Sequence, residues 1–128
     1  GLKPLAMIDG MYSREAASAA ARDLFARDER PDAIFVGNDH MAFAVMDTLR
    51  FELGLSVPGD VSVIGYDDVP LAAWPSYNLT TIRQPVRRMV EATVEIIIDQ
   101  IEGETAPCRI HIDGPLIERG TVRERTKE

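Results

Sequence analysis

Two short and unbroken apolar runs constrain the fold of this chain most. Residues 33–37 read AIFVG and residues 61–65 read VSVIG, and a stretch with apolar residues at helical spacing precedes each run. Unbroken apolar strands are typical of parallel sheets, because helices cover both faces of such sheets and bury every side chain. The sequence therefore predicts an α/β fold in which helices cover both faces of a parallel sheet.

Helical spacing and turn residues predict the remaining elements. We expect an additional first strand at residues 5–8 and two closing strands at 109–112 and 115–118. Helices are expected at residues 14–28, 39–53 and 85–102. Ser13 is a suitable N-cap for the first of these helices, and Pro85 is acceptable in the first turn of the third.

Length and charge limit the classes of function. The 128 residues suffice for one domain, and a net charge of −7 disfavours binding to the phosphate backbone of nucleic acids. No apolar run approaches the roughly 20 residues needed to cross a bilayer, and no signal peptide pattern is visible. A single cysteine, Cys108, excludes an internal disulfide, which suits a cytoplasmic protein.

Polar and aromatic side chains follow three predicted strands, at the point where each strand ends. Tyr12 follows the first of them, Asn38 the second and Asp67 the third. Ligands of open α/β sheets bind outside the carboxyl ends of the strands, so we expect these residues to face one site. Carboxylate and amide groups pair with hydroxyl groups, and an aromatic ring packs on a sugar or a base. The pattern predicts a site for a small, polar, neutral ligand.

Structural roles remain open for several residues near this site. Asn38 and Asp39 can cap the second helix, and Asp39 is the more strongly expected cap. Asp68 can anchor the loop that follows it, and Tyr12 can pack on its own helix as a hydrophobic staple. His40 is expected to be solvated.

Enzyme chemistry is not predicted. A phosphoacceptor site on the clustered aspartates needs a lysine near the phosphoryl group, and the only lysines, Lys3 and Lys127, lie near the two ends of the chain. The sequence also lacks a glycine-rich phosphate loop, a histidine and cysteine set with metal spacing, and a nucleophile elbow. We therefore predict no catalytic residue, no metal and no cofactor.

Four stretches of the chain, in this order and spacing, resemble the lactose/galactose-repressor family. They are PDAIFVGNDHMAFAVM (31–46), VPGDVSVIGYDDVPLA (57–72), LTTIRQP (79–85) and PLIERGT (115–121). The resemblance implies a lobe like that of periplasmic binding proteins, incomplete here, from a two-lobed effector-binding domain. A DNA-binding headpiece is expected to lie outside the chain.

The resemblance also implies how residues 1–128 divide between the lobes. Residues 1–78 are expected to form the core of the C-terminal lobe, and residues 79–85 a hinge crossing. Residues 86–103 would be a helix of the other lobe, and residues 106–121 closing strands.

Ligand-responsive regulation of transcription is the function that this resemblance implies. The chain would be the effector-binding and dimerisation part of a cytoplasmic repressor, which binds a sugar or nucleobase-like effector and contacts operator DNA only through the headpiece. Four residues match positions at which the family contacts its effector. The resemblance implies that Tyr12 is an aromatic contact, that Asn38 and Asp67 are polar contacts, and that Val86 is an apolar contact. The alternative is a sugar-binding protein of a transport system.

A homodimer is implied as well. The family pairs through the helix after the Asn-Asp motif and the loop after the Asp-Asp motif. The residues at these positions are Met41, Phe43, Ala44, Val45, Leu71 and Trp74. The apolar side of the third helix should pack on a second copy, with exchange of residues 86–103 between copies, because its usual cover is missing. With one cleft wall, this chain alone should bind effector weakly or not at all.

Overall fold

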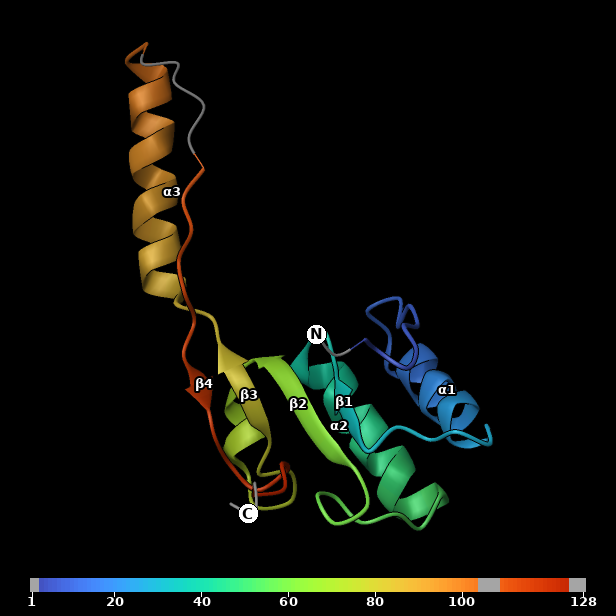
Figure 1. Ribbon diagram of the computed structural model, residues 1–128. Coiled ribbons are helices and arrows are strands. Elements are labelled where there is room, and N and C mark those ends of the chain that lie inside the picture. Colours follow the sequence, from blue (N-terminus) through green and yellow to red (C-terminus); the bar gives the residue numbers. More distant parts are fainter. Residues whose placement is uncertain (1–2, 104–108, 125–128) are drawn as a thin grey trace.

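A computed structural model describes residues 3–103 and 109–124 (Figure 1). Four strands form one sheet in the order β1-β2-β3-β4. The strands β1 (Ala33–Phe35), β2 (Ser62–Asp67) and β3 (Thr80–Arg83) run parallel, whereas β4 (Leu116–Ile117) runs antiparallel to β3. The predicted α/β fold is confirmed, with the correction that its last strand makes the sheet mixed.

Three α-helices accompany the sheet in the described residues. They are α1 (Arg14–Phe25), α2 (Asp39–Asp47) and α3 (Val86–Ile101). A π-helical turn, η1 (Thr48–Glu52), continues α2, and a short 3-10 helix, η2 (Pro70–Ala73), follows β2. Ser13 caps α1 as predicted, because its hydroxyl accepts a hydrogen bond from the amide of Ala16.

Two predicted strands are wrong. Residues 5–8 form no strand; together with α1 and β1 they line an apolar cavity of about 500 Å³. Residues 109–112 form none either. Strand β3 ends at Arg83, whose amide donates a hydrogen bond to the carbonyl of Pro115. Residues 109–112 come before Pro115 and lie beyond this end of β3, so they have no strand to pair with.

The hydrophobic core lies on one side of the sheet. Helix α2 packs against both α1 and β2, and the core includes Phe43, Met46 and Val63. On the opposite side of the sheet Phe35 is 61% exposed and Leu116 is 50% exposed. The predicted helical cover of both faces is therefore found on one face only within the described residues.

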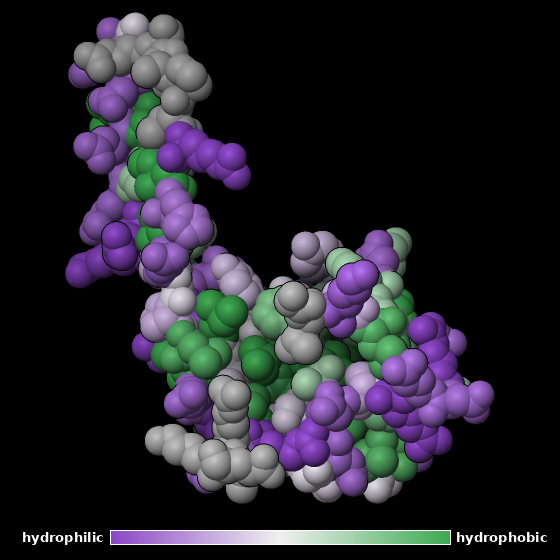
Figure 2. Space-filling view, viewed as in Figure 1, coloured by the Kyte–Doolittle hydropathy of each residue, from purple (hydrophilic) through white to green (hydrophobic). Residues whose placement is uncertain are grey.

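Helix α3 leaves the sheet at the end of β3 and projects away from the core (Figure 1). None of its residues is buried, and apolar residues lie exposed along it between polar ones (Figure 2). Ile97 is 50% exposed and Ile101 is 79% exposed. Among the described residues, no helix has the length and apolar character that crossing a membrane requires.

Candidate ligand-binding site

The parallel pairing of β1 and β2 brings Asn38 and Asp67 to the same edge of the sheet. Asp67 is the last residue of β2, and Asn38 follows β1 three residues after its end. The side-chain oxygen of Asn38 accepts a hydrogen bond from the amide of Met41 at 2.8 Å, so Asn38 is the N-cap of α2. Both Asn38 and Asp67 are half-buried, so part of each polar group still faces solvent.

Tyr12 reaches this edge through the turn that precedes α1. A Cβ on Gly10, in the same turn, would lie 2.7 Å from the sulfur of Met41, so this turn packs closely on the first turn of α2. Tyr12 adopts the left-handed conformation with φ 48°, and it is 86% exposed. Tyr12 therefore presents its ring to solvent from a turn that packs on the start of α2.

Asp39, at the same edge of the sheet, has a structural role that the sequence did not predict correctly. It does not cap α2 but is the first residue of the helix, and it is fully buried. Its carboxylate accepts hydrogen bonds from the hydroxyl of Thr81 at 2.6 Å and from the amide of Val69 at 2.9 Å. Burial raises the pKa of Asp39, and the bond from Thr81 opposes this shift. Asp39 therefore joins α2, β3 and the loop after β2.

Gly65 makes the position of Asp39 possible. A Cβ at this residue of β2 would lie 2.3 Å from an oxygen of the Asp39 carboxylate. Only glycine lets the backbone of β2 and the carboxylate approach so closely. The glycine is visible in the sequence, but nothing near it indicates that a carboxylate from α2 packs there.

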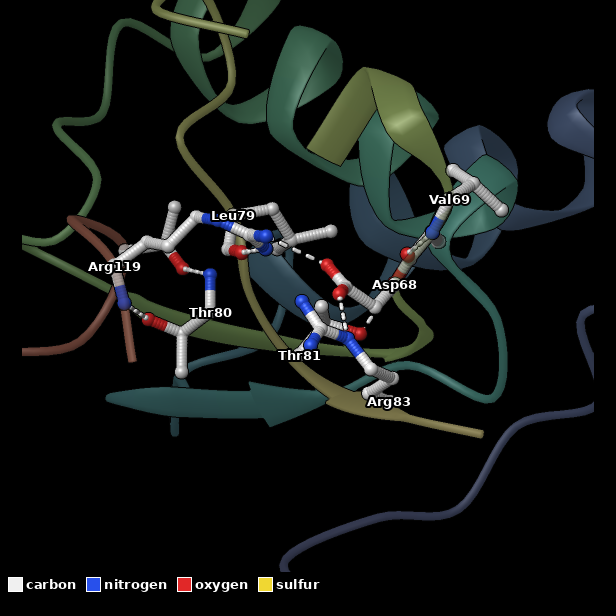
Figure 3. Close-up of polar contacts among 9 residues, drawn as sticks. Asp68, Val69, Leu79, Thr80, Thr81, Arg83 and Arg119 are labelled. Carbon is white, nitrogen blue, oxygen red and sulfur yellow. Dashed lines mark hydrogen bonds and ion pairs between the residues drawn. The ribbon is translucent and has the colours of Figure 1, made fainter. Parts of the chain in front are cut away.

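Asp67 and Asp68, at the end of β2, bind residues at the end of β3 and after β4. Figure 3 shows the contacts of Asp68 with Arg83 and Arg119. The amide of Gln84 donates a hydrogen bond to the carboxylate of Asp67. The carboxylate of Asp68 accepts from Arg83 and from Arg119, each at 2.6 Å. We call these five residues the crossing clamp, because they connect the strand that enters α3 with the strand that returns from it.

Asp68 is almost fully enclosed within the crossing clamp, with 5% of its side chain exposed. Burial alone would raise the pKa of Asp68, but the hydrogen bonds from Arg119 and Arg83 outweigh it and hold the pKa below its ordinary value. Asp68 thus anchors its loop, which is one of the roles that the sequence left open.

Val86, the fourth predicted contact, is the first residue of α3 and is 60% exposed. Its amide donates to the carbonyl of Gln84, the residue that holds Asp67. Val86 therefore lies at the base of α3, close in the chain to the polar edge. Within the parts of the chain that the structure describes, no group of three histidine, cysteine, aspartate or glutamate residues could hold a metal ion.

Most of the residues predicted for a dimer interface lie in the core of the chain. Met41, Phe43, Ala44 and Val45 are 0% to 7% exposed. The ring of Tyr77 packs on Phe43 with centroids 4.3 Å apart, which removes Phe43 from the surface. These four residues leave almost no surface for a partner, so the structure does not support that part of the predicted interface. Trp74 is 58% exposed and Leu71 is half-buried.

Known proteins resemble the chain over most of its length. Residues 1–122 match the model of the periplasmic binding protein-like domain family. The HTH-type transcriptional repressor PurR of Vibrio cholerae is 38% identical over 122 residues, which are 94% of this chain and 36% of the relative. The repressor of the same name from Photobacterium profundum is 40% identical over 119 residues, 92% of this chain and 35% of the relative. The chain thus spans about a third of the length of these relatives.

Solved structures agree with these sequence matches. The lac repressor dimer bound to operator and the anti-inducer ONPF superposes with a TM-score of 0.84 and 28% identity, over 94% of this chain and 42% of that one. The complex of the transcriptional regulator CelR with cellobiose gives a TM-score of 0.77 and 33% identity, over 86% of this chain and 34% of that one.

Proposed function

We infer function from one premise: this chain belongs to the periplasmic binding protein-like domain family, and within it to the effector-binding domains of the lactose/galactose repressors. We propose that it is the effector-binding and dimerisation part of a ligand-responsive transcription repressor that acts in the cytoplasm. The observation that carries the proposal is that Asn38 and Asp67 meet at the carboxyl edge of parallel strands, where α/β folds bind ligands.

The ligand class follows from the chemistry of this edge. Asp67 accepts hydrogen bonds, and the amide of Asn38 both donates and accepts, so the pair suits the hydroxyl groups of a sugar. Tyr12 offers an exposed ring for the apolar face of such a ligand, and Val86 offers an apolar contact at the base of α3. The similarity to a regulator bound to cellobiose supports a sugar as one candidate, beside a nucleobase-like ligand.

Binding rather than catalysis is the proposed role. The relatives are named as transcription repressors, and the polar groups of the edge are engaged in caps and ion pairs rather than beside a nucleophile. The same relatives favour a repressor over a transport-linked sugar-binding protein of the same fold.

A homodimer is the proposed assembly. The lac repressor structure that resembles this chain is a dimer. Leu71 within η2 and Trp74 directly after it supply one surface, since a half-exposed tryptophan in an irregular loop is a suitable anchor for a partner. The exposed apolar residues of α3 supply a second surface, through which we propose that two copies of this chain exchange residues 86–103.

The experiment that tests the function uses the complete gene product and the DNA upstream of its own gene. Fluorescence anisotropy would measure binding to this DNA, and cellobiose, galactose, ribose, adenine and guanine would then be added one at a time. We expect specific binding to the DNA and a shift in its affinity of about tenfold or more with one compound, which corresponds to a coupling of about 1.4 kcal/mol. The proposal would be refuted if the protein bound neither the DNA nor any of the five compounds.

A further inference from the structure

Helix α3 carries a row of apolar residues spaced four apart. Val90, Val94 and Ile98 are each about half exposed, and residues at this spacing lie on one face of a helix. An acidic row lies beside the apolar one, and a shallow groove runs between them. The groove is lined by Val90, Glu91, Val94, Glu95, Ile98 and Asp99. Because α3 stands apart from the core, this face is open to a partner along its length (Figure 1).

The charges of α3 are unfavourable to the helix on its own. A helix is stabilised by acidic residues at its start and basic residues at its end, because of its dipole. The first turn of α3 has no acidic residue, and its last turn has no basic residue. Instead Arg87 and Arg88 lie at its start, and Glu95, Asp99 and Glu102 lie toward its end. A neighbour of opposite charge at each end would offset this arrangement.

A second α3 supplies that neighbour only if it runs in the opposite direction. Two arginines and one glutamate give residues 86–93 a net charge of +1, and three acidic residues give residues 94–102 a net charge of −3. In a parallel pair, like charges would lie level with one another at both ends. In an antiparallel pair, the basic start of each helix lies beside the acidic end of the other, so charge complementarity selects this direction.

The spacing of the apolar row gives the register of such a pair. The row is symmetric about Val94, so an antiparallel copy centred there places Val94 opposite Val94 and Val90 opposite Ile98 of the second copy. Arg87 then lies near Glu102 of that copy. Arg87 is 91% exposed, and its contact with Glu91 on the same helix is long, at 3.8 Å, so its guanidinium is available to a second copy.

We propose that two copies of this chain associate through antiparallel α3 helices, with the two-fold axis at Val94 and ion pairs between Arg87 and Glu102 at both ends. This inference rests on the proposed homodimer, and it names the orientation and the register of the surface on α3. The ligand edge and the crossing clamp take no part in the pairing. Binding of effector and DNA is therefore tested separately from it.

The first test is disulfide cross-linking of the full 128-residue chain. Val90→Cys and Ile98→Cys are made separately in a Cys108→Ser background, and one of the two chains carries a heavy-isotope label for mass spectrometry. A mixture in glutathione buffer should form the mixed disulfide. Each variant alone should not, because identical positions lie about 12 Å apart along an antiparallel pair, and a disulfide needs Cβ atoms within about 4.5 Å.

Sedimentation velocity on the same samples separates the possible failures. A dimer in which each variant cross-links to itself would be parallel, and a dimer without any cross-link would pair through another contact. Either result would overturn the proposed orientation while leaving the homodimer intact. A chain that stays monomeric would overturn the proposed dimer through α3 and, with it, this inference.

The second test exchanges the charges at the two ends of α3. Arg87→Glu and Glu102→Arg should each raise the dissociation constant of the dimer by about threefold or more, because each brings like charges together at both ends. The double variant should return to within about twofold of wild type. The two residues are 15 positions apart on one helix, about 22 Å, so they cannot pair within one copy. A double variant that is as weak as the single variants would overturn the ion pairs between copies.

Discussion

Asp39 is the residue at which three parts of the fold meet. A buried carboxylate is costly unless hydrogen bonds replace the water that it loses. Thr81 and Val69 supply these bonds from β3 and from the loop that carries the aspartate pair. The proposed ligand edge therefore depends on a buried polar contact that joins β3 to the loop after β2.

Replacing Thr81 by valine tests this contact. Valine has nearly the shape of threonine but cannot donate to the carboxylate of Asp39, so we expect the free energy of unfolding to fall by about 2 kcal/mol. Urea denaturation measures the change. Thr93→Val is the matched control, because the Thr93 hydroxyl bonds only to the carbonyl of Met89 on an exposed helix, and it should change stability by less than about 0.5 kcal/mol. Equal midpoints for Thr81→Val and wild type would contradict the role of Asp39.

Because of the ion-paired carboxylate of Asp68, we expect the free energy of unfolding to depend on pH. Its pKa is lower in the folded chain than in the unfolded chain, so its contribution to stability is fully present above the unfolded pKa, about 3.9, and is lost as the pH falls through the folded pKa. Asp39 has the opposite sign, because its raised pKa makes its ionisation unfavourable to folding as the pH rises above about 4.

The variant Asp68→Asn isolates the first of these effects. At pH 7 we expect it to be less stable than wild type by about 2 kcal/mol, since Arg83 and Arg119 lose their charged partner. The difference should shrink as the pH falls below about 4, where Asp68 of the unfolded wild-type chain takes up a proton, and it should be lost as the pH falls through the lower folded pKa. Urea denaturation at a series of pH values measures it, with Asp99→Asn, an exposed residue of α3, as the control. A difference that stays constant with pH would contradict the assignment.

At the scale of single residues, the sequence predicted local contacts and missed distant ones. The cap at Ser13 followed from the residue type that precedes α1, whereas α2 is capped by Asn38 and not by the more strongly expected Asp39. The partner of Asp39 lies 42 residues away in the chain, and Asp68 pairs with Arg119 across 51 residues. Such contacts depend on how the strands are ordered, which local spacing does not encode.

At the scale of elements, β1, β2 and the start of α1 lay close to their predicted positions because each has strong local patterning. The strands predicted at residues 5–8 and 109–112 were wrong because a short apolar run does not by itself determine whether a segment pairs with another strand. The antiparallel direction of β4 likewise depends on where the chain returns, and the sequence pattern did not indicate it.

Helix α3 supports a prediction about self-association. Its exposed apolar residues should associate with a second copy, so sedimentation velocity should show the wild-type chain as a dimer at high concentration. The double variant Ile97→Glu, Ile101→Glu should weaken this association by at least about tenfold, a loss of about 1.4 kcal/mol or more. Glu95→Lys, a charged residue of the same helix, should still form the dimer. A wild-type chain that is monomeric at every concentration tested would contradict the prediction.

At the scale of the whole molecule, the structure presents one wall of the proposed ligand site. Tyr12 and Val86 are largely exposed, and a ligand pocket normally encloses most of its ligand. Helix α3 leaves this wall from the crossing clamp, so ligand contacts at Asp67 lie next to the base of a helix that projects from the lobe. This arrangement suits a protein in which ligand binding changes the position of α3 relative to the sheet.

The most direct test of the central claim is whether Asp67 and Asn38 bind the same ligand. Isothermal titration of the complete gene product with the five sugars and bases should identify a compound that binds wild type. Asp67→Asn and Asn38→Ala should each weaken its binding by about tenfold or more, the loss expected when a charged or buried hydrogen-bond partner is removed. Asp99→Asn should bind as tightly as wild type. If both site variants retained wild-type affinity, the carboxyl edge of this sheet would not be the ligand site.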